Sequence, residues 1–164
     1  MFFLTDWDTI WLESARILPQ GMILVTSREN IISFLGQYMA SQENVQFAYL
    51  FGSYAENKHK KDSDIDVAVY LSGVPEAELF RYKLNLKIEL EDKLKTLVNV
   101  VVMNSAPPLL NHEVFKNGVI VKNSDPTVLS QFRARNFYYY LDQMYIINSY
   151  LEATKERIRV ELNK

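Results

Sequence analysis

The feature that most constrains this chain is a Gly-Ser pair and an Asp-x-Asp pair, each next to a short apolar segment. Gly52-Ser53 follows Val45–Phe51, and ten residues later Asp64 and Asp66 open the segment Ile65–Leu71. Both segments are rich in aromatic and β-branched residues, so we predict two strands. Because strand side chains alternate between faces, Asp64 and Asp66 are expected on the same face.

These four residues suit nucleotide chemistry. Two carboxylates on one face provide the hard oxygen ligands that hold Mg²⁺ against nucleotide phosphates. Gly52 allows a backbone to approach a phosphate closely, and Ser53 adds a hydroxyl and an amide at a helix start. Each dipeptide alone is common as a turn or a strand end. Their combination between two strands favours a site that holds a triphosphate against metal-bound carboxylates, as in nucleotidyl transfer.

Two helices are predicted before the strand pair. The first covers Asp6 to Leu18, where Trp7 and Trp11 make it either core or interface. The second begins near Thr26, since Thr26 and Glu29 form a capping-box pattern. Its apolar stripe consists of Ile31, Phe34, Leu35, Tyr38 and Met39.

After the second strand the pattern is mixed. Glu76 to Lys95 contains a stretch of strict apolar and polar alternation, which is typical of a strand. The segment is nevertheless long, free of Gly and Pro, and rich in Leu, Lys and Glu, so we predict a helix. Leu97–Met103 is predicted as the third strand, Pro107–Phe115 as a short helix and Val119–Val121 as a further strand.

The C-terminal segment predicts one long helix. Asp125-Pro126 provides an N-cap and a proline at the first helical position. Nothing breaks the helix before Lys164, and apolar residues recur every three or four positions. A helix of this length would extend beyond a compact domain or fold back onto it, and periodicity alone does not separate these alternatives. It carries half of the ten tyrosines, namely Tyr138, Tyr139, Tyr140, Tyr145 and Tyr150.

Two stretches resemble a known family. The run GSYAENKHKKDSDIDVAVYL resembles the G-S-x10-D-x-D signature of the DNA polymerase β-like nucleotidyltransferase superfamily. The run VNVVVMNSAPPLLNHEVFKNGVIV is similar to the strand, Asn-x-Ala-Pro-Pro helix and hairpin of minimal nucleotidyltransferases (MNT), the antitoxins of bacterial HEPN/MNT toxin–antitoxin pairs. The resemblance covers about Thr26 to Asp125. It implies an α+β nucleotidyltransferase fold, a small mixed β-sheet flanked by helices, to which the sequence adds the long C-terminal helix.

The expected domain organisation follows. Residues 1–25 form an N-terminal helical extension, residues 26–124 the nucleotidyltransferase core, and residues 125–164 a C-terminal helix that is a candidate partner interface. Neither His59 nor His112 has an Arg four to six residues before it, so the ribonuclease motif of a HEPN toxin is absent. The chain is therefore expected to be the antitoxin half of such a pair.

The resemblance also implies a reaction. ATP is the donor and Mg²⁺ the cofactor, and AMP is transferred to a tyrosine of the cognate HEPN toxin, a ribonuclease that is silenced in a hetero-oligomer. By motif, the resemblance implies that Asp64 and Asp66 ligate the metal and that the catalytic residues are Asp64, Asp66 and Asn99. Gly52, Ser53 and Ser63 are the nucleotide-binding residues.

Two positions depart from the family pattern. Arg-Gly usually follows Gly-Ser-x-Ala, and this chain has Glu56-Asn57; asparagine tolerates a left-handed backbone, which would preserve the turn. Asn99 stands where the family has its third catalytic carboxylate. An amide oxygen can ligate a cation but brings no charge and accepts no proton. Activity is then weakened or lost, or another carboxylate substitutes, or Asn99 is an engineered substitution.

Two other functions are compatible with parts of the sequence. A catalytically impaired homologue would neutralise its partner by binding, and a small-molecule, aminoglycoside-type nucleotidyltransferase would need a substrate domain that only the terminal helices could supply. The net charge of −2 gives no basis for direct nucleic-acid binding, and the run from Lys58 to Lys61 favours a solvated loop. No cysteine is present, and no apolar run or signal-peptide pattern suggests a membrane, so we expect a cytoplasmic protein.

Overall fold

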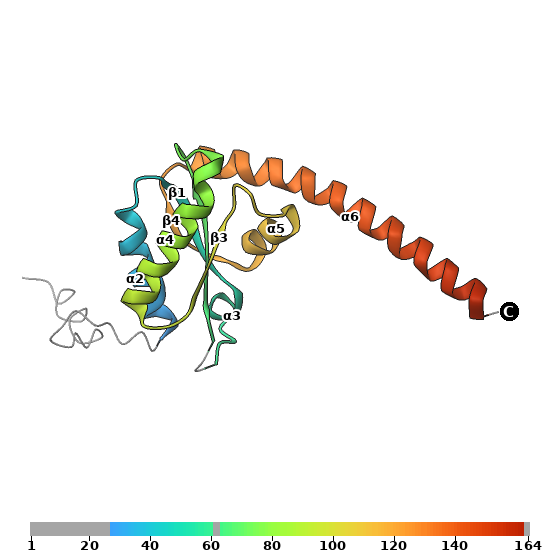
Figure 1. Cartoon of the computed structure of the whole chain (residues 1–164), viewed down its shortest axis with the longest axis horizontal. Coiled ribbons are helices and arrows are strands. Elements are labelled where there is room, and N and C mark those ends of the chain that lie inside the picture. The colour runs from blue at the N-terminus through green and yellow to red at the C-terminus, as the bar shows by residue number, and fades with distance from the viewer. Residues whose placement is uncertain (1–26, 61–62, 163–164) are drawn as a thin grey trace, which may run out of the picture.

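The computed structural model describes residues 27–60 and 63–162 (Figure 1). The predicted helix from Asp6 to Leu18 lies outside these residues. Along the chain the elements are α2 (Arg28–Ala40), β1 (Val45–Phe51), α3 (Gly52–Ala55), β2 (Ile65–Leu71), α4 (Glu76–Leu94), β3 (Val98–Val102), α5 (Pro108–Asn117), β4 (Val119–Asn123) and α6 (Pro126–Leu162).

The four strands form one mixed sheet in the order β3-β2-β1-β4. Strand β1 lies antiparallel to both β2 and β4, whereas β2 and β3 are parallel. A parallel pair needs a crossover connection, and α4 provides it between β2 and β3. The expected small mixed sheet flanked by helices is confirmed.

The helices cover the two faces of the sheet differently. Helices α2 and α4 pack on one face, where Leu35 and Leu90 meet the β2 side chains Ile65 and Val67. Helix α5 and the start of α6 cover the other face, where Phe132 packs with residues such as Phe47 and Ala68. Because Asp66 has the same parity in β2 as Ala68, its side chain lies on the face that carries α5 and α6.

Helix α4 confirms the choice of helix over strand. Its buried residues recur at helical spacing, with Leu86 and Leu90 one turn apart and turned into the core. Leu84 and Ile88, which completed the alternating pattern, are instead exposed on the outer side of the helix. A short run of alternation is compatible with a helix when only half of its apolar residues face inward.

The start of α2 differs from the predicted one. The N-cap is Ser27, whose hydroxyl accepts a hydrogen bond from the backbone N–H of Asn30 at 3.2 Å. The capping box of Thr26 and Glu29 is therefore wrong by one residue. Ser27 and Thr26 are both good N-caps in sequence, so cap preference alone does not choose between them.

Asn104, the asparagine of the Asn-x-Ala-Pro-Pro motif, joins β3 to β2 beyond the end of the strand pairing. Its Oδ1 accepts from the backbone N–H of Leu71 and its Nδ2 donates to the Leu71 carbonyl, both at 2.8 Å. A side-chain amide thus takes the place of a backbone unit in the ladder. Asn104 thus extends the pairing between β2 and β3, and it does so at the end of β2 opposite to Asp66.

Helix α6 projects from the domain (Figure 1). The Asp125 carboxylate caps its first turn by accepting from Thr127 N–H at 2.8 Å, as predicted. Phe132 and Asn136 are buried, but no residue from Phe137 to Arg159 is. The alternative in which the helix folds back onto the domain is thus wrong. No helix among the described residues is long and apolar enough to cross a membrane.

Candidate active site

The predicted site residues meet where β1 ends and β2 and β3 begin. In register, Asp66 of β2 lies opposite Phe51 of β1 and beside Asn99 of β3. Asp64 precedes β2, and the intervening Ile65 is buried in the core on the opposite face. Strand alternation therefore places Asp64 and Asp66 on one side of the sheet, with Asn99 next to them.

Asn99 contacts both carboxylates. Its Nδ2 lies 3.1 Å from Oδ1 of Asp66 and 3.4 Å from Oδ2 of Asp64. Because one nitrogen reaches both acids, their oxygens converge on a common point. The amide N–H groups occupy this point as donors, and rotation of the amide would present its oxygen there instead.

Ionisation of the Asp66 carboxyl group is energetically unfavourable in this site. Burial raises the pKa of Asp66 above its ordinary value, the Asn99 hydrogen bond opposes that rise, and the negative charge of Asp64 adds to it. Both raising effects disfavour the ionised carboxylate. A cation between Asp64 and Asp66 would relieve them, so the electrostatics of the pair suit a divalent ion.

Gly52 is required by both conformation and space. Its φ is +69°, in the left-handed region that disfavours residues with a Cβ. A Cβ at this position would lie 3.0 Å from Cγ of Asp66 and closer still to its Oδ2. The backbone at the start of α3 thus passes directly against the Asp66 carboxylate, and Ser53 follows in the first turn. No side chain caps this end of α3.

The loop between α3 and β2 is ordered by its own contacts in the part that the structure describes. Ser63 is hydrogen-bonded to Lys60: its Oγ accepts from Lys60 N–H at 2.8 Å and its N–H donates to the Lys60 carbonyl at 3.1 Å. The His59 ring stacks on Tyr54 with centroids 4.2 Å apart. Asn57 adopts φ +57°, which confirms the expected left-handed turn. The predicted nucleotide-binding role of Ser63 stays a prediction.

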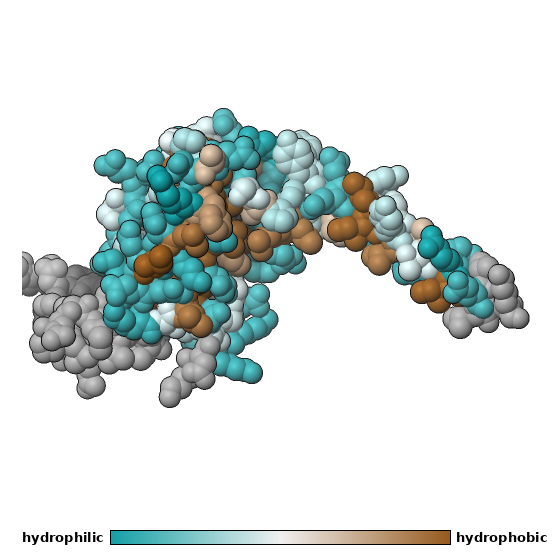
Figure 2. Space-filling view, in the orientation of Figure 1, coloured by the Kyte–Doolittle hydropathy of each residue, from teal (hydrophilic) through white to brown (hydrophobic). Residues whose placement is uncertain are grey.

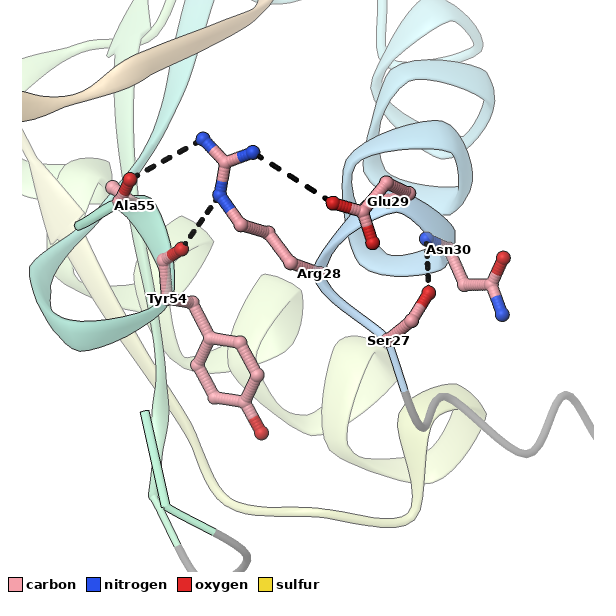
Figure 3. A network of polar contacts seen from close by, with 6 residues as sticks. All are labelled: Ser27, Arg28, Glu29, Asn30, Tyr54 and Ala55. Carbon is pink, nitrogen blue, oxygen red and sulfur yellow. Dashed lines mark hydrogen bonds and ion pairs between the residues drawn. The ribbon is translucent and has the colours of Figure 1, made fainter. Parts of the chain in front are cut away.

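Arg28 is a residue that the sequence did not single out. From α2 its Nε donates to the Tyr54 carbonyl at 2.9 Å and its guanidinium also donates to the Ala55 carbonyl at 3.3 Å (Figure 3). These two carbonyls lie at the end of α3, so Arg28 ties that short helix to α2. The contact to the neighbouring Glu29 is longer, at 4.0 Å, and exposed.

We expect Arg28→Ala to lower the free energy of unfolding by about 1–3 kcal/mol, because two partly buried carbonyls lose their charged donor. Chemical denaturation measures this change. Glu29→Ala is the matched control and should cost less than about 1 kcal/mol, since it removes an exposed ion pair and one acidic charge from the first turn of α2. Equal effects of the two substitutions would contradict the anchoring role of Arg28.

The ligand set for a metal is small. Among residues 27–60 and 63–162 no three His, Cys, Asp or Glu side chains gather as a metal cluster. Asp64 and Asp66 supply carboxylate oxygens, and Asn99 adds an amide. This all-oxygen set fits Mg²⁺, which is commonly bound by one or two carboxylates together with substrate phosphates and water.

Comparison with known proteins places these features in a family. The profile of the family described as "Polymerase beta, Nucleotidyltransferase" matches residues 29–127. A candidate protein adenylyltransferase of Methanocaldococcus jannaschii is 38% identical over 80 residues, which are 49% of this chain and 83% of the relative.

Two solved structures share the fold. One is a toxin–antitoxin structure with AMP-PNP, at a TM-score of 0.62 and 21% identity over 73% of this chain and 95% of the matched chain. The other contains the tri-AMPylated HEPN toxin of Shewanella oneidensis in complex with an MNT antitoxin, at a TM-score of 0.59 and 19% identity over 75% of this chain and 98% of the matched one.

Proposed function

The chain belongs to the polymerase beta nucleotidyltransferase family, and from this we propose that it transfers AMP from ATP to a tyrosine hydroxyl of a HEPN toxin, acting as its antitoxin. The observation that carries the proposal is the convergence of Asp64 and Asp66 beside the glycine turn at Gly52. It is supported by the relative described as a protein adenylyltransferase and by the fold shared with toxin–antitoxin structures, one of them containing an AMPylated toxin.

Each site residue has a distinct role in this proposal. Asp64 and Asp66 would hold Mg²⁺ through their carboxylate oxygens, and Asn99, which lies beside both, would offer its amide oxygen. Bound there, Mg²⁺ supplies positive charge that neutralises the triphosphate and the developing charge on the α-phosphoryl group. The backbone N–H groups at Gly52 and Ser53 bind phosphate oxygens, because the first turn of a helix leaves its donors without intrahelical partners.

A second function is favoured by one observation. Asn99 donates to both carboxylates and cannot accept the proton of an attacking hydroxyl. In this alternative the chain is a catalytically impaired homologue that neutralises its partner by forming a complex. It predicts a stable complex and no consumption of ATP.

Intact-mass spectrometry of a HEPN-type protein from the same genome, as the proposed partner, tests the proposal. The partner is incubated with the chain, ATP and Mg²⁺, and adducts of AMP mass are expected. The Asp64→Ala, Asp66→Ala double variant should give none, because it removes both carboxylate ligands. If neither the chain nor its double variant gives an adduct, and the chain still forms a stable complex with the partner, the binding function is favoured instead.

A further inference from the structure

The projecting part of α6 carries most of the exposed apolar side chains of the described structure. Figure 2 shows apolar residues on this helix well away from the domain. Tyr145 and Tyr150 are 76% and 73% exposed. The other large apolar residues exposed here are Phe137, Tyr138, Tyr139, Leu141, Ile146, Ile147, Leu151 and Ile158. An apolar surface of this extent marks an interaction site.

One turn of the helix is apolar all round. Met144, Tyr145, Ile146 and Ile147 are consecutive, and four consecutive residues cover the whole circumference of an α-helix. A helix that is apolar on every side is stable in water only when it is surrounded. Pairing with one α6 of a second copy would cover a single stripe and leave the rest of this turn in water. The geometry therefore favours a partner that has a groove between at least two helices, into which α6 inserts.

A basic cleft lies at the base of this helix. It has a volume of about 490 Å³ between α5 and α6, and its lining includes His112, Lys116, Arg133 and Phe137 but no carboxylate. Arg133 lies over the Phe115 ring at 5.7 Å. In the part of the chain that the structure describes, neither Lys116 nor Arg133 forms an ion pair. Phe137 belongs to both the cleft and the exposed apolar surface, so the two are continuous.

We propose that α6 inserts into a groove between helices of a partner protein, and that an acidic side chain of this partner enters the α5/α6 cleft against Arg133 and Lys116. The identification of the partner with the HEPN-type substrate protein rests on the proposed function; the groove and the acidic residue rest on α6 and the cleft. Docking through α6 leaves the Asp64 and Asp66 site open and holds the substrate protein at high effective concentration.

Titration calorimetry with the HEPN-type protein proposed as partner tests the apolar part of the surface. Ile146→Asp with Leu151→Asp should weaken binding by about 30-fold or more, as expected for central apolar contacts. Ser72→Asp, an exposed polar position between β2 and α4 and away from α6, is the control for added charge and should bind as the wild type does. Ile146 and Leu151 are both exposed, so the melting temperature of the double variant should equal that of the wild type. Equal affinity of the double variant and the control would overturn the proposal.

The basic cleft is tested by Arg133→Glu with Lys116→Glu. We expect binding to weaken by about tenfold and to lose most of its dependence on salt concentration, because a charge pair with the partner is removed. Lys155→Glu near the tip of α6 is the control and should have little effect. Unchanged affinity and salt dependence of the double variant would show that no acidic group enters the cleft.

Two further measurements separate this proposal from the proposed function. The Asp64→Ala, Asp66→Ala variant should bind the partner with wild-type affinity although it transfers no AMP. Binding through α6 without any AMP adduct would contradict the proposed AMP transfer and still support docking through α6. AMP transfer by the wild type, with no loss of binding in the α6 variants, would support AMP transfer and contradict docking through α6. Sedimentation of the chain alone should show a monomer, and self-association abolished by Leu151→Asp would assign α6 to a second copy.

Discussion

Replacing Asn99 by Asp is expected to raise the rate of AMP transfer by about 100-fold. A positioned proton acceptor contributes about 10² to 10⁴ in rate, and Asn99 supplies none. Its Nδ2 lies within hydrogen-bonding distance of both Asp66 and Asp64, so a carboxylate at this position would join them around one point. That point would then have three negative groups for a divalent cation instead of two.

The same substitution should make the fold dependent on the cation. The pKa of Asp66 is already raised by burial and by Asp64, and the Asn99 hydrogen bond counteracts this. Removing the donor and adding a charge disfavours ionised Asp66 further. A raised carboxylate pKa means that stability is lost as pH rises through that pKa. Without metal, Asn99→Asp should therefore be less stable than the wild type at pH 7. This difference in stability should become smaller below about pH 4, where carboxyl groups are largely protonated in the unfolded chain too.

Single-turnover AMP transfer and thermal melting with and without Mg²⁺ measure these two effects. Asn99→Ala is the matched control, since it removes the amide without adding a carboxylate, and it should give no increase in rate. Mg²⁺ should raise the melting temperature of Asn99→Asp more than that of the wild type, because a ligand stabilises the form that binds it. An equal rate for Asn99→Asp and the wild type would mean that the third carboxylate is not what limits the reaction.

Gly52→Ala is expected to abolish AMP transfer, with a loss of more than about 100-fold, because misplacing reacting groups by about 1 Å costs a factor of this size. The new methyl group would overlap the Asp66 carboxylate, so either Asp66 or the start of α3 must move. The positive φ of +69° adds backbone strain. Together these effects should cost about 2–4 kcal/mol of stability, the upper part of the usual range for single substitutions.

Gly73→Ala separates the two contributions. Gly73 has a similar φ of +72°, but the nearest atom to its Cβ would be Nδ2 of Asn44 at an ordinary 3.7 Å. It should cost about 1–2 kcal/mol from conformation alone and leave AMP transfer unchanged. Chemical denaturation and transfer rates are measured on both variants. Matching losses of stability in the two variants would show that contact with Asp66 is unimportant.

Much of the fold followed from local patterns. The strands Val45–Phe51 and Ile65–Leu71 were predicted with the bounds that the structure has, because β-branched and aromatic residues between polar turns leave few alternatives. The shared face of Asp64 and Asp66 also follows from sequence, since alternation in a strand is a local property. Helix α4 was predicted from residue propensity over a long window, which outweighed a short alternating run.

Contacts between distant segments could not be predicted in this way. Arg28 donates to carbonyls 26 and 27 residues further along the chain, and backbone acceptors have no sequence signature. Asn99 was identified from the family pattern, but its bond to both carboxylates depends on the parallel register of β2 and β3 across the α4 crossover.

The sequence by itself determined the glycine turn, the acidic pair and most of the elements that the structure describes, because each depends on residues close together in the chain. Only the tertiary structure decided that α6 projects. The apolar period of α6 is the same for a helix that packs on its own domain and for one that awaits a partner. What distinguishes them is whether the domain has an uncovered face to receive the helix, and here α5 and the first turns of α6 already cover that face around Phe132. Most of the large apolar residues from Leu141 to Ile158 therefore stay exposed.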